Sequence, residues 1–167
     1  MSKIIIIGPA YPLRGGLATF NEHLARQFMA EGHEVIIYTF SLQYPNFLFP
    51  GKTQYSESGA PRDLNIKVCI NSVNPLNWYL SGQKIQKECA DIVICRYWLP
   101  FMGPCLGTIA RLIKKNNITK VIGLIDNALP HEKRPGDRQF TQYFTKAMDG
   151  FVTMSRYVLY DLKQFTK

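Results

Sequence analysis

The most polar loop of the sequence follows a buried strand predicted at residues 120–125. It runs from Asp126 to Asp137 and crowds titratable groups of both signs into a short segment that includes His131. Carboxylate and imidazole groups accept, donate and transfer protons. Because doubly wound sheets bind ligands at the carboxyl ends of central strands, we expect the chemistry of this protein to lie in this loop, which contains Asp126 and His131. A structural role for the histidine stays open.

A second candidate site precedes the first predicted helix, at Gly15 and Gly16. The apolar run at residues 4–7 predicts a buried strand before it, and the helix after it presents unpaired N–H groups and the positive end of its dipole. Glycines leave room for a phosphate or a sugar to approach these groups. The same pair also suits a tight turn from loop to helix, and the sequence leaves both interpretations open.

Two better-known phosphate-binding loops are excluded by their spacing. The nicotinamide-type fingerprint needs Gly-x-Gly-x-x-Gly after the first strand and an acidic residue at the end of the second. This chain has Gly8-Pro-Ala10 instead, and its second predicted strand ends at residues 38–41 without a carboxylate. The segment Gly51-Lys-Thr53 imitates the end of a P-loop, but the first glycine of that motif would fall on Asn46.

Alternating strands and helices must position these loops. Short apolar runs predict strands at residues 4–7, 34–40, 65–70, 91–95, 120–125 and 150–154. Helices are predicted from residue 16 to the stop at Gly32, at 76–89 and 107–116, after an N-cap at Asp137, and at 157–165. In the first helix, Leu17, Phe20, Leu24, Phe28 and Met29 are predicted to form the apolar face. We therefore expect one α/β domain over residues 1–167, with a Rossmann-like doubly wound parallel sheet in strand order near 3-2-1-4-5-6.

The first of these units is similar to the opening of the GT-B glycosyltransferases of family 4, the "group 1" retaining enzymes. The resemblance rests on Pro12-Leu-Arg-Gly-Gly-Leu-Ala-Thr-Phe-Asn-Glu-His-Leu-Ala25 and on Glu31-Gly-His-Glu-Val-Ile-Ile37. That family also carries a loop of the type His-Asn-x-x-Pro-His-Glu, followed by a helix, a strand and a serine. Similar residues stand here at 126–132 and at Ser155. The resemblance implies the N-terminal half of a GT-B fold.

The resemblance also implies that both loops border a cleft where a donor diphosphate and an acceptor meet. The frequent active-site histidine of the family falls on Asp126, and His131 matches a second histidine of some members, so the resemblance implies that Asp126 and His131 are the catalytic residues. Residues 96–103 are similar to an aromatic segment that borders the cleft in the family. The substrate-binding residues predicted on these segments are Arg14, Gly15, Gly16, Arg96, Tyr97, Asn127, Glu132 and Ser155.

The function that the resemblance implies is transfer of a sugar, of the hexosyltransferase type, from a nucleotide-diphosphate sugar to a saccharide or lipid-linked acceptor. It implies no metal and no cofactor beyond the donor substrate. It also implies a C-terminal donor-binding domain, absent from this chain, without which we expect no transfer. The rival interpretation is a non-catalytic module that binds a phosphate, a sugar or a partner protein with the same kind of sheet.

Composition sets broader limits. Hydrophobic residues make up 46% of the 167 residues, which suffices for one core. The sequence lacks an apolar run of ~18 residues and starts directly with a predicted strand, so we expect a cytoplasmic protein. The four cysteines match no zinc or redox spacing and are expected to be reduced core residues.

The formal net charge of +8 favours anionic partners. The basic residues are dispersed and form no recognised nucleic-acid-binding motif, so we expect no nucleic-acid partner. Helix 107–116 is basic, and both a solvated face and a peripheral contact at the inner face of a membrane stay open for it. The aromatic residues of the long loop 41–63 either line an acceptor site or pack the loop against the domain.

Overall fold

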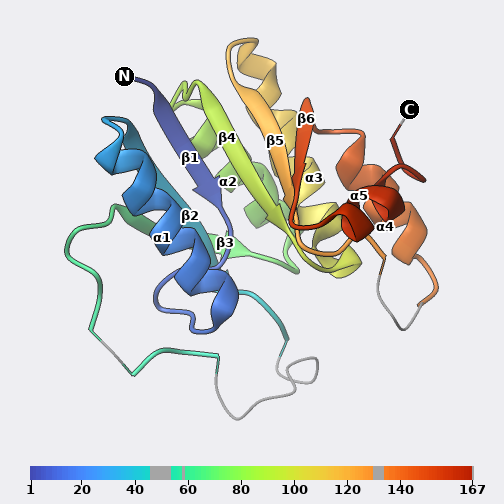
Figure 1. Cartoon of the computed structure of the whole chain (residues 1–167), viewed down its shortest axis with the longest axis horizontal. Helices are drawn as coiled ribbons and strands as arrows, with labels where there is room; N and C mark the ends of the chain where they lie inside the picture. The colour runs from blue at the N-terminus through green and yellow to red at the C-terminus, as the bar shows by residue number, and fades with distance from the viewer. Residues whose placement is uncertain (46–53, 58, 130–133, 167) are drawn as a thin grey trace.

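Six parallel strands form one sheet with the first strand near its centre (Figure 1). The structure is a computed structural model and describes residues 1–45, 54–57, 59–129 and 134–166. The strands are β1 (Lys3–Ile7), β2 (Glu34–Leu42), β3 (Ile66–Asn71), β4 (Ile92–Tyr97), β5 (Lys120–Ile125) and β6 (Gly150–Thr153). Their order is β3-β2-β1-β4-β5-β6, and every neighbouring pair is parallel. The predicted α/β, Rossmann-like architecture and strand order are confirmed.

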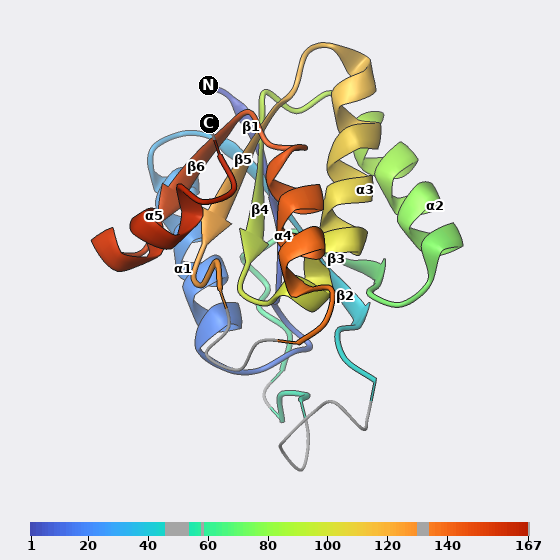
Figure 2. The same ribbon diagram turned by 90° about the vertical axis from the view of Figure 1, so that its right-hand side faces the viewer.

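Helices cover both faces of this sheet. They are α1 (Gly16–Ala30), α2 (Pro75–Gln86), α3 (Gly103–Ile113), α4 (Asp137–Thr145) and α5 (Arg156–Leu162). Figure 2 shows α1 on one side of the sheet and α2, α3 and α4 on the other. Because each helix connects parallel strands, the N-termini of α1 and α2 lie at the carboxyl edge of the sheet.

The core explains why β1 is apolar at successive positions. Ile5 and Ile7 belong to a large buried cluster with residues of α2, α3 and α4, while Ile4 and Ile6 pack with Ala25 of α1. Side chains alternate between the two faces of a strand, so a strand that is covered on both faces is apolar throughout. The short isoleucine run therefore marks the centre of the sheet.

The amino edge of the sheet is held by a charged network around Glu88. Its carboxylate accepts hydrogen bonds from Lys67 Nζ at 2.6 Å, Lys3 Nζ at 2.7 Å and the Tyr38 hydroxyl at 2.8 Å. Hydrogen bonds from the two lysines lower the pKa of Glu88 to about 2. This network ties α2 to three strands at the edge opposite the predicted site.

Three local predictions are wrong. The fourth strand does not end before Arg96 but includes Arg96 and Tyr97, because β4 continues its pairing with β5 as far as Ile125. Helix α3 starts at Gly103 rather than at 107, with a proline in its first turn that favours a helix start. Asp137 is the first residue of α4 and not its N-cap, and its carboxylate accepts a hydrogen bond from the Arg134 backbone N–H at 2.7 Å.

The cysteines only partly follow the prediction. All four are free, and Cys95 and Cys105 are buried as expected, but Cys69 is half-buried and Cys89 is exposed. Cys89 closes the turn after α2 with a positive φ of 47°, a position that the sequence pattern did not reveal. Across the part of the chain that the structure describes, no helix has the length and hydrophobicity needed to span a bilayer.

Candidate functional site

The two predicted glycines lie at the N-terminus of helix α1, and the structural requirement for glycine differs between the two positions. Gly15 is the N-cap, with φ 116°, a backbone conformation that residues with a Cβ rarely adopt. Gly16 has no such φ, and a Cβ placed on it would meet no atom of the described residues within 4 Å. Backbone strain therefore accounts for Gly15, whereas neither strain nor packing requires glycine at position 16.

The loop between β1 and α1 is held by side chains of α1 and β2. The Ala10 N–H donates to Thr39 Oγ1 at 3.0 Å, and the Tyr11 N–H donates to Glu22 Oε1 at 2.9 Å. The Arg14 N–H pairs with the Gln54 carbonyl at 2.9 Å, while the Arg14 side chain is exposed. The loop thus has fixed backbone contacts and presents its one basic side chain to solvent.

Arg96, predicted as a substrate-binding residue, is buried at the centre of the site. Its side chain is only 3% exposed, and its guanidinium donates to both carboxylate oxygens of Asp126, at 2.7 and 2.5 Å. The ring of Phe20 lies over it, with 4.2 Å from Cζ to the ring centroid. A paired, covered guanidinium is suited to holding another side chain in place. Arg96 therefore positions Asp126, and the substrate contact predicted for Arg96 stays a prediction.

Asn21 links this pair to the glycine loop. It is fully buried on α1, where its Oδ1 accepts a hydrogen bond from Arg96 at 3.1 Å and its Nδ2 donates to the Pro9 carbonyl at 2.8 Å. Sequence reasoning missed this residue. The available signal was its spacing from Ala18 and Ala25, because the three residues form the buried stripe of α1. A polar residue at such a position needs a buried partner.

Asp126 follows β5 at the carboxyl edge of the sheet. Its backbone N–H donates to the Tyr97 carbonyl at 2.9 Å, and its side chain remains 20% exposed. Ionised carboxylate oxygens accept more than one hydrogen bond each, so Asp126 retains acceptor capacity toward a ligand. Asn127 beside it is half-buried. His131 and Glu132 lie outside the described residues, and their predicted roles stay predictions.

Tyr97 belongs to the core rather than to the site. Its ring stacks on Phe144 of α4 with 4.3 Å between centroids, and its hydroxyl shares a 2.8 Å hydrogen bond with Thr141 Oγ1. Burial raises the pKa of this hydroxyl, which keeps it protonated. The side chain next to Arg96 necessarily points to the other face of the sheet. We therefore remove Tyr97 from the candidate site.

The remaining predicted contacts have structural explanations. Ser155 is the N-cap of α5, where its hydroxyl accepts a hydrogen bond from the Val158 N–H at 3.2 Å. In the long loop, Tyr44 accepts a hydrogen bond from Trp98 Nε1, and its ring lies 6.5 Å from that of Phe101. These contacts favour the packing interpretation for these aromatics, while residues 46–53 are outside the described part.

The arrangement combines an open helix terminus with a positioned carboxylate at one edge of the sheet. The N–H groups of the first turn of α1 can bind an anion, and Asp126 can accept hydrogen bonds from hydroxyl groups. Within residues 1–45, 54–57, 59–129 and 134–166, no cluster of three or more His, Cys, Asp or Glu side chains could hold a metal ion.

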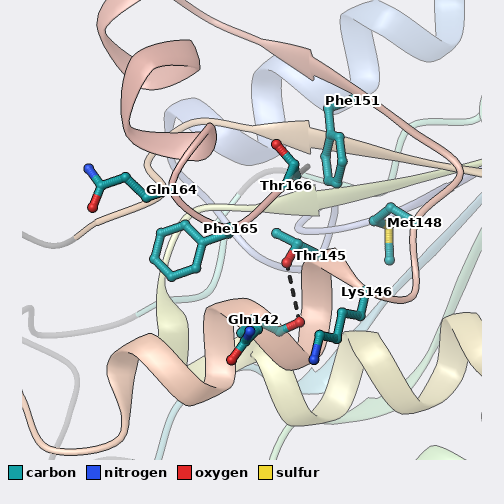
Figure 3. Close-up of a pocket in the computed structure, with 8 residues that line it drawn as sticks. All are labelled: Gln142, Thr145, Lys146, Met148, Phe151, Gln164, Phe165 and Thr166. Atoms are coloured by element: carbon teal, nitrogen blue, oxygen red, sulfur yellow. Dashed lines mark hydrogen bonds between the residues drawn. The ribbon is translucent and has the colours of Figure 1, made fainter.

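A cavity of about 580 Å³ lies elsewhere, between the end of α4 and the segment after α5 (Figure 3). It is lined by Gln142, Thr145, Lys146, Met148, Phe151, Gln164, Phe165 and Thr166. None of the predicted site residues that the structure describes lines it. The pair of loops at Gly16 and Asp126 is therefore a separate feature of the fold.

The two glycines give a matched test of the helix terminus. We expect Gly16→Val to leave the melting temperature of the chain nearly unchanged and to weaken binding of inorganic pyrophosphate roughly tenfold, because the new side chain would occupy the open approach to α1. Gly15→Val should instead cost about 1–2 kcal/mol of stability, because of its φ. Thermal melting would measure the effect on stability, and NMR titration of the backbone amide signals at positions 16 and 17 would measure pyrophosphate binding. Unchanged pyrophosphate binding by Gly16→Val would contradict an anion site here.

Similar solved structures support the fold. No protein-family model matches this sequence, and no curated protein matches it significantly. An α-glucosyltransferase in complex with UDP and a 13-mer DNA containing an A:G mismatch superposes with a TM-score of 0.63 at 14% identity, over 96% of this chain and 39% of its own. An α-glucosyltransferase in complex with UDP and a 13-mer DNA containing an HMU base gives 0.53 at 14% identity, over 90% and 37%.

A third similar structure is a short-chain dehydrogenase/reductase (wide type) from Veillonella parvula in complex with NADP, with a TM-score of 0.48 at 12% identity, over 92% of this chain and 68% of its own. At such identities, the two glucosyltransferase matches show a shared Rossmann-like fold. The chain spans about two fifths of the length of these glucosyltransferases.

Proposed function

We propose that this chain is the N-terminal, acceptor-side domain of a retaining GT-B glycosyltransferase of family 4, which transfers a hexose from a nucleotide-diphosphate sugar to an acceptor. The observation that carries the proposal is the open position of Gly16. Neither strain nor packing requires glycine there, and space for a ligand at a helix N-terminus accounts for it.

In this proposal, the N-terminus of α1 binds the diphosphate of the donor and Asp126 binds the sugar. The first N–H groups of α1 and the exposed Arg14 bind the donor diphosphate and stabilise its charge as it departs. Asp126 accepts a hydrogen bond from a sugar hydroxyl, and Arg96 with Asn21 holds it in the orientation that this contact needs. Most of the catalysis is therefore positioning and electrostatic stabilisation, and no metal is invoked.

Two independent likenesses support the proposal. The sequence resembles the opening and the Asp126 loop of the family 4 enzymes, and the fold matches that of glucosyltransferases solved with UDP. Both of those structures also contain DNA. The basic residues of this chain form no recognised nucleic-acid motif, so we propose a saccharide or lipid-linked acceptor and include DNA as the alternative in the test.

The test is consumption of a nucleotide-sugar donor. We expect the 167-residue chain to fold but to leave donors intact, whereas a longer protein in which a nucleotide-binding domain follows residue 167 should release nucleotide diphosphate in the presence of an acceptor. The assay pairs UDP- and GDP-sugars with saccharide, lipid-linked and DNA acceptors. Transfer by the chain alone would contradict the half-domain assignment. Donor binding by the longer protein without transfer to any acceptor would favour the non-catalytic module.

A further inference from the structure

The outward face of α2 carries an apolar stripe with a basic end. Leu76 is 66% exposed and Leu80 is 55% exposed, and Val73 and Tyr79 lie exposed beside them. Leu76, Tyr79 and Leu80 stand three and four residues apart, which is the spacing of one helix face, and Val73 lies in the turn before the helix. Exposed apolar residues scattered singly are ordinary, but several on and beside one helix face need an explanation.

The orientation of α2 is fixed by its other face. Trp78 Nε1 donates to the Asn71 carbonyl at 2.7 Å, and Ile85 is buried in the core. At Gly82 an added Cβ would lie 2.6 Å from a methyl group of Leu112 on α3, so the two helices are in close contact. Rotating α2 to bury Leu76 and Leu80 would break these contacts. The apolar stripe therefore faces outward as part of the folded state, and Figure 2 shows α2 as the outermost helix on its side.

The basic end of the stripe is formed by Lys84 and Lys87, both exposed. Together with Leu80, Gln83 and Glu88 they line a shallow cavity of about 490 Å³. Glu88 is the one carboxylate of this lining, and Lys3 and Lys67 already bind it. Among the described residues neither lysine forms an ion pair, although Lys84 Nζ lies 6.0 Å from the centroid of the Tyr38 ring. Both side chains remain exposed, so neither charge is neutralised by a carboxylate of the described residues.

We propose that this stripe, Val73, Leu76, Tyr79 and Leu80 with Lys84 and Lys87, is a docking surface for an anionic lipid bilayer. Apolar side chains of a surface helix enter the boundary between headgroups and acyl chains, while lysines are attracted to anionic headgroups. The net charge of +8 favours the same partner. A second copy of the chain fits less well, because symmetric pairing of two stripes would bring four lysines together without a compensating carboxylate on the stripe.

The basic helix α3, for which the sequence left a membrane contact open, is less suited to that role. Its Arg111 donates to the Tyr143 carbonyl at 2.7 Å and stacks on the Tyr143 ring, and Lys114 pairs with Asp149 at 2.7 Å. These contacts use the charges of Arg111 and Lys114 within the domain and leave Lys115 as the exposed basic residue of this segment. We therefore assign the membrane contact to α2 instead of α3. The N-terminus of α2 lies at the same edge of the sheet as Asp126. The inference does not depend on glycosyl transfer.

The test is co-sedimentation of the 167-residue protein with phospholipid vesicles. We expect binding to vesicles of phosphatidylcholine and phosphatidylglycerol in equal parts, weak binding to phosphatidylcholine alone, and release by salt. Leu76→Ser with Leu80→Ser should lower the partition coefficient roughly tenfold or more, and so should Lys84→Gln with Lys87→Gln. Equal binding to neutral and anionic vesicles, or no binding by the unmodified protein, would overturn the proposal.

The matched control is on α5, where Tyr157 and Tyr160 are 68% and 71% exposed. Tyr157→Ser with Tyr160→Ser should bind anionic vesicles as the unmodified protein does, and a loss equal to that of the α2 variants would show non-specific adsorption instead. Thermal melting should be similar for all variants, because every replaced side chain is exposed. Sedimentation velocity tests whether a second copy of the chain covers the stripe instead. Self-association that disappears in the variant with Leu76→Ser and Leu80→Ser would assign the stripe to a second copy and contradict the lipid assignment.

Discussion

Replacing Arg96 with methionine is expected to lower the free energy of unfolding of this chain by about 3–5 kcal/mol. The substitution keeps an unbranched side chain of similar length but removes the donors that Asp126 and Asn21 use. The carboxylate then remains in a site that is only 20% exposed, without its partner. For a chain of this size the loss corresponds to a fall in melting temperature of roughly 6–20 °C. Chemical denaturation followed by circular dichroism would measure it.

The control for this experiment is Arg156→Met, at an exposed position on α5. It should change the unfolding free energy by no more than ~0.5 kcal/mol. The denaturant slope should stay the same in both variants, so that a shift in midpoint reports stability. An effect of Arg96→Met no larger than that of the control would show that the ion pair adds no net stability and that Asp126 is positioned by other contacts.

Combining Arg96→Met with Asp126→Leu is expected to separate the structural role of the pair from its role in the proposed reaction. Removing both charges leaves no unpaired ion, and replacing a buried ion pair with apolar residues is often neutral or stabilising, so most of the stability lost in Arg96→Met should return. Turnover of the longer protein that includes the donor-binding domain should still fall on the order of a hundredfold, because the sugar hydroxyl loses its acceptor.

The measurement is the rate at saturating donor and acceptor, beside the melting temperature of the same protein. A double variant that folds and keeps the unmodified turnover would remove Asp126 from the active site and leave the Gly16 terminus as the supported ligand site. A double variant that stays as unstable as Arg96→Met would instead indicate that Asn21, and not the charge of Asp126, is the group that needs Arg96. The two outcomes are distinct because stability and rate are measured separately.

The fold could be predicted because its signals are local. Each central strand is a short, β-branched run, each helix follows within a few residues, and right-handed connection of such units leaves few strand orders. The strand ends also predicted that the loops at Gly16 and Asp126 lie at the carboxyl edge of the sheet, and the structure places both there, after β1 and after β5. Boundaries such as that of β4 were less accurate, because ladder pairing with β5 extends a strand beyond its apolar run.

The connection between those loops could not be predicted, because it depends on tertiary contacts. The sequence pattern assigned the large residues Leu17, Phe20 and Leu24 to the apolar face of α1, yet Phe20 and Met29 are exposed and the buried stripe is Ala18, Asn21 and Ala25. Small side chains let a helix approach a sheet closely, which a hydrophobicity pattern does not reveal. Only the structure shows that Asn21 then meets Arg96.

The adjacent placement of Arg96 and Tyr97 also limits how β4 can change in length. Arg96 points to α1, where it binds the polar side chain of Asn21, and Tyr97 points to α4, where it stacks on the aromatic ring of Phe144. Inserting or deleting one residue upstream in this strand would exchange the two faces, with a guanidinium against Phe144 and a phenol ring beside Asp126. Point substitutions in β4 can be compensated locally, but a single-residue insertion or deletion would disturb the core and the site together. Length variation in this part of the chain should therefore be confined to the turns that flank β4.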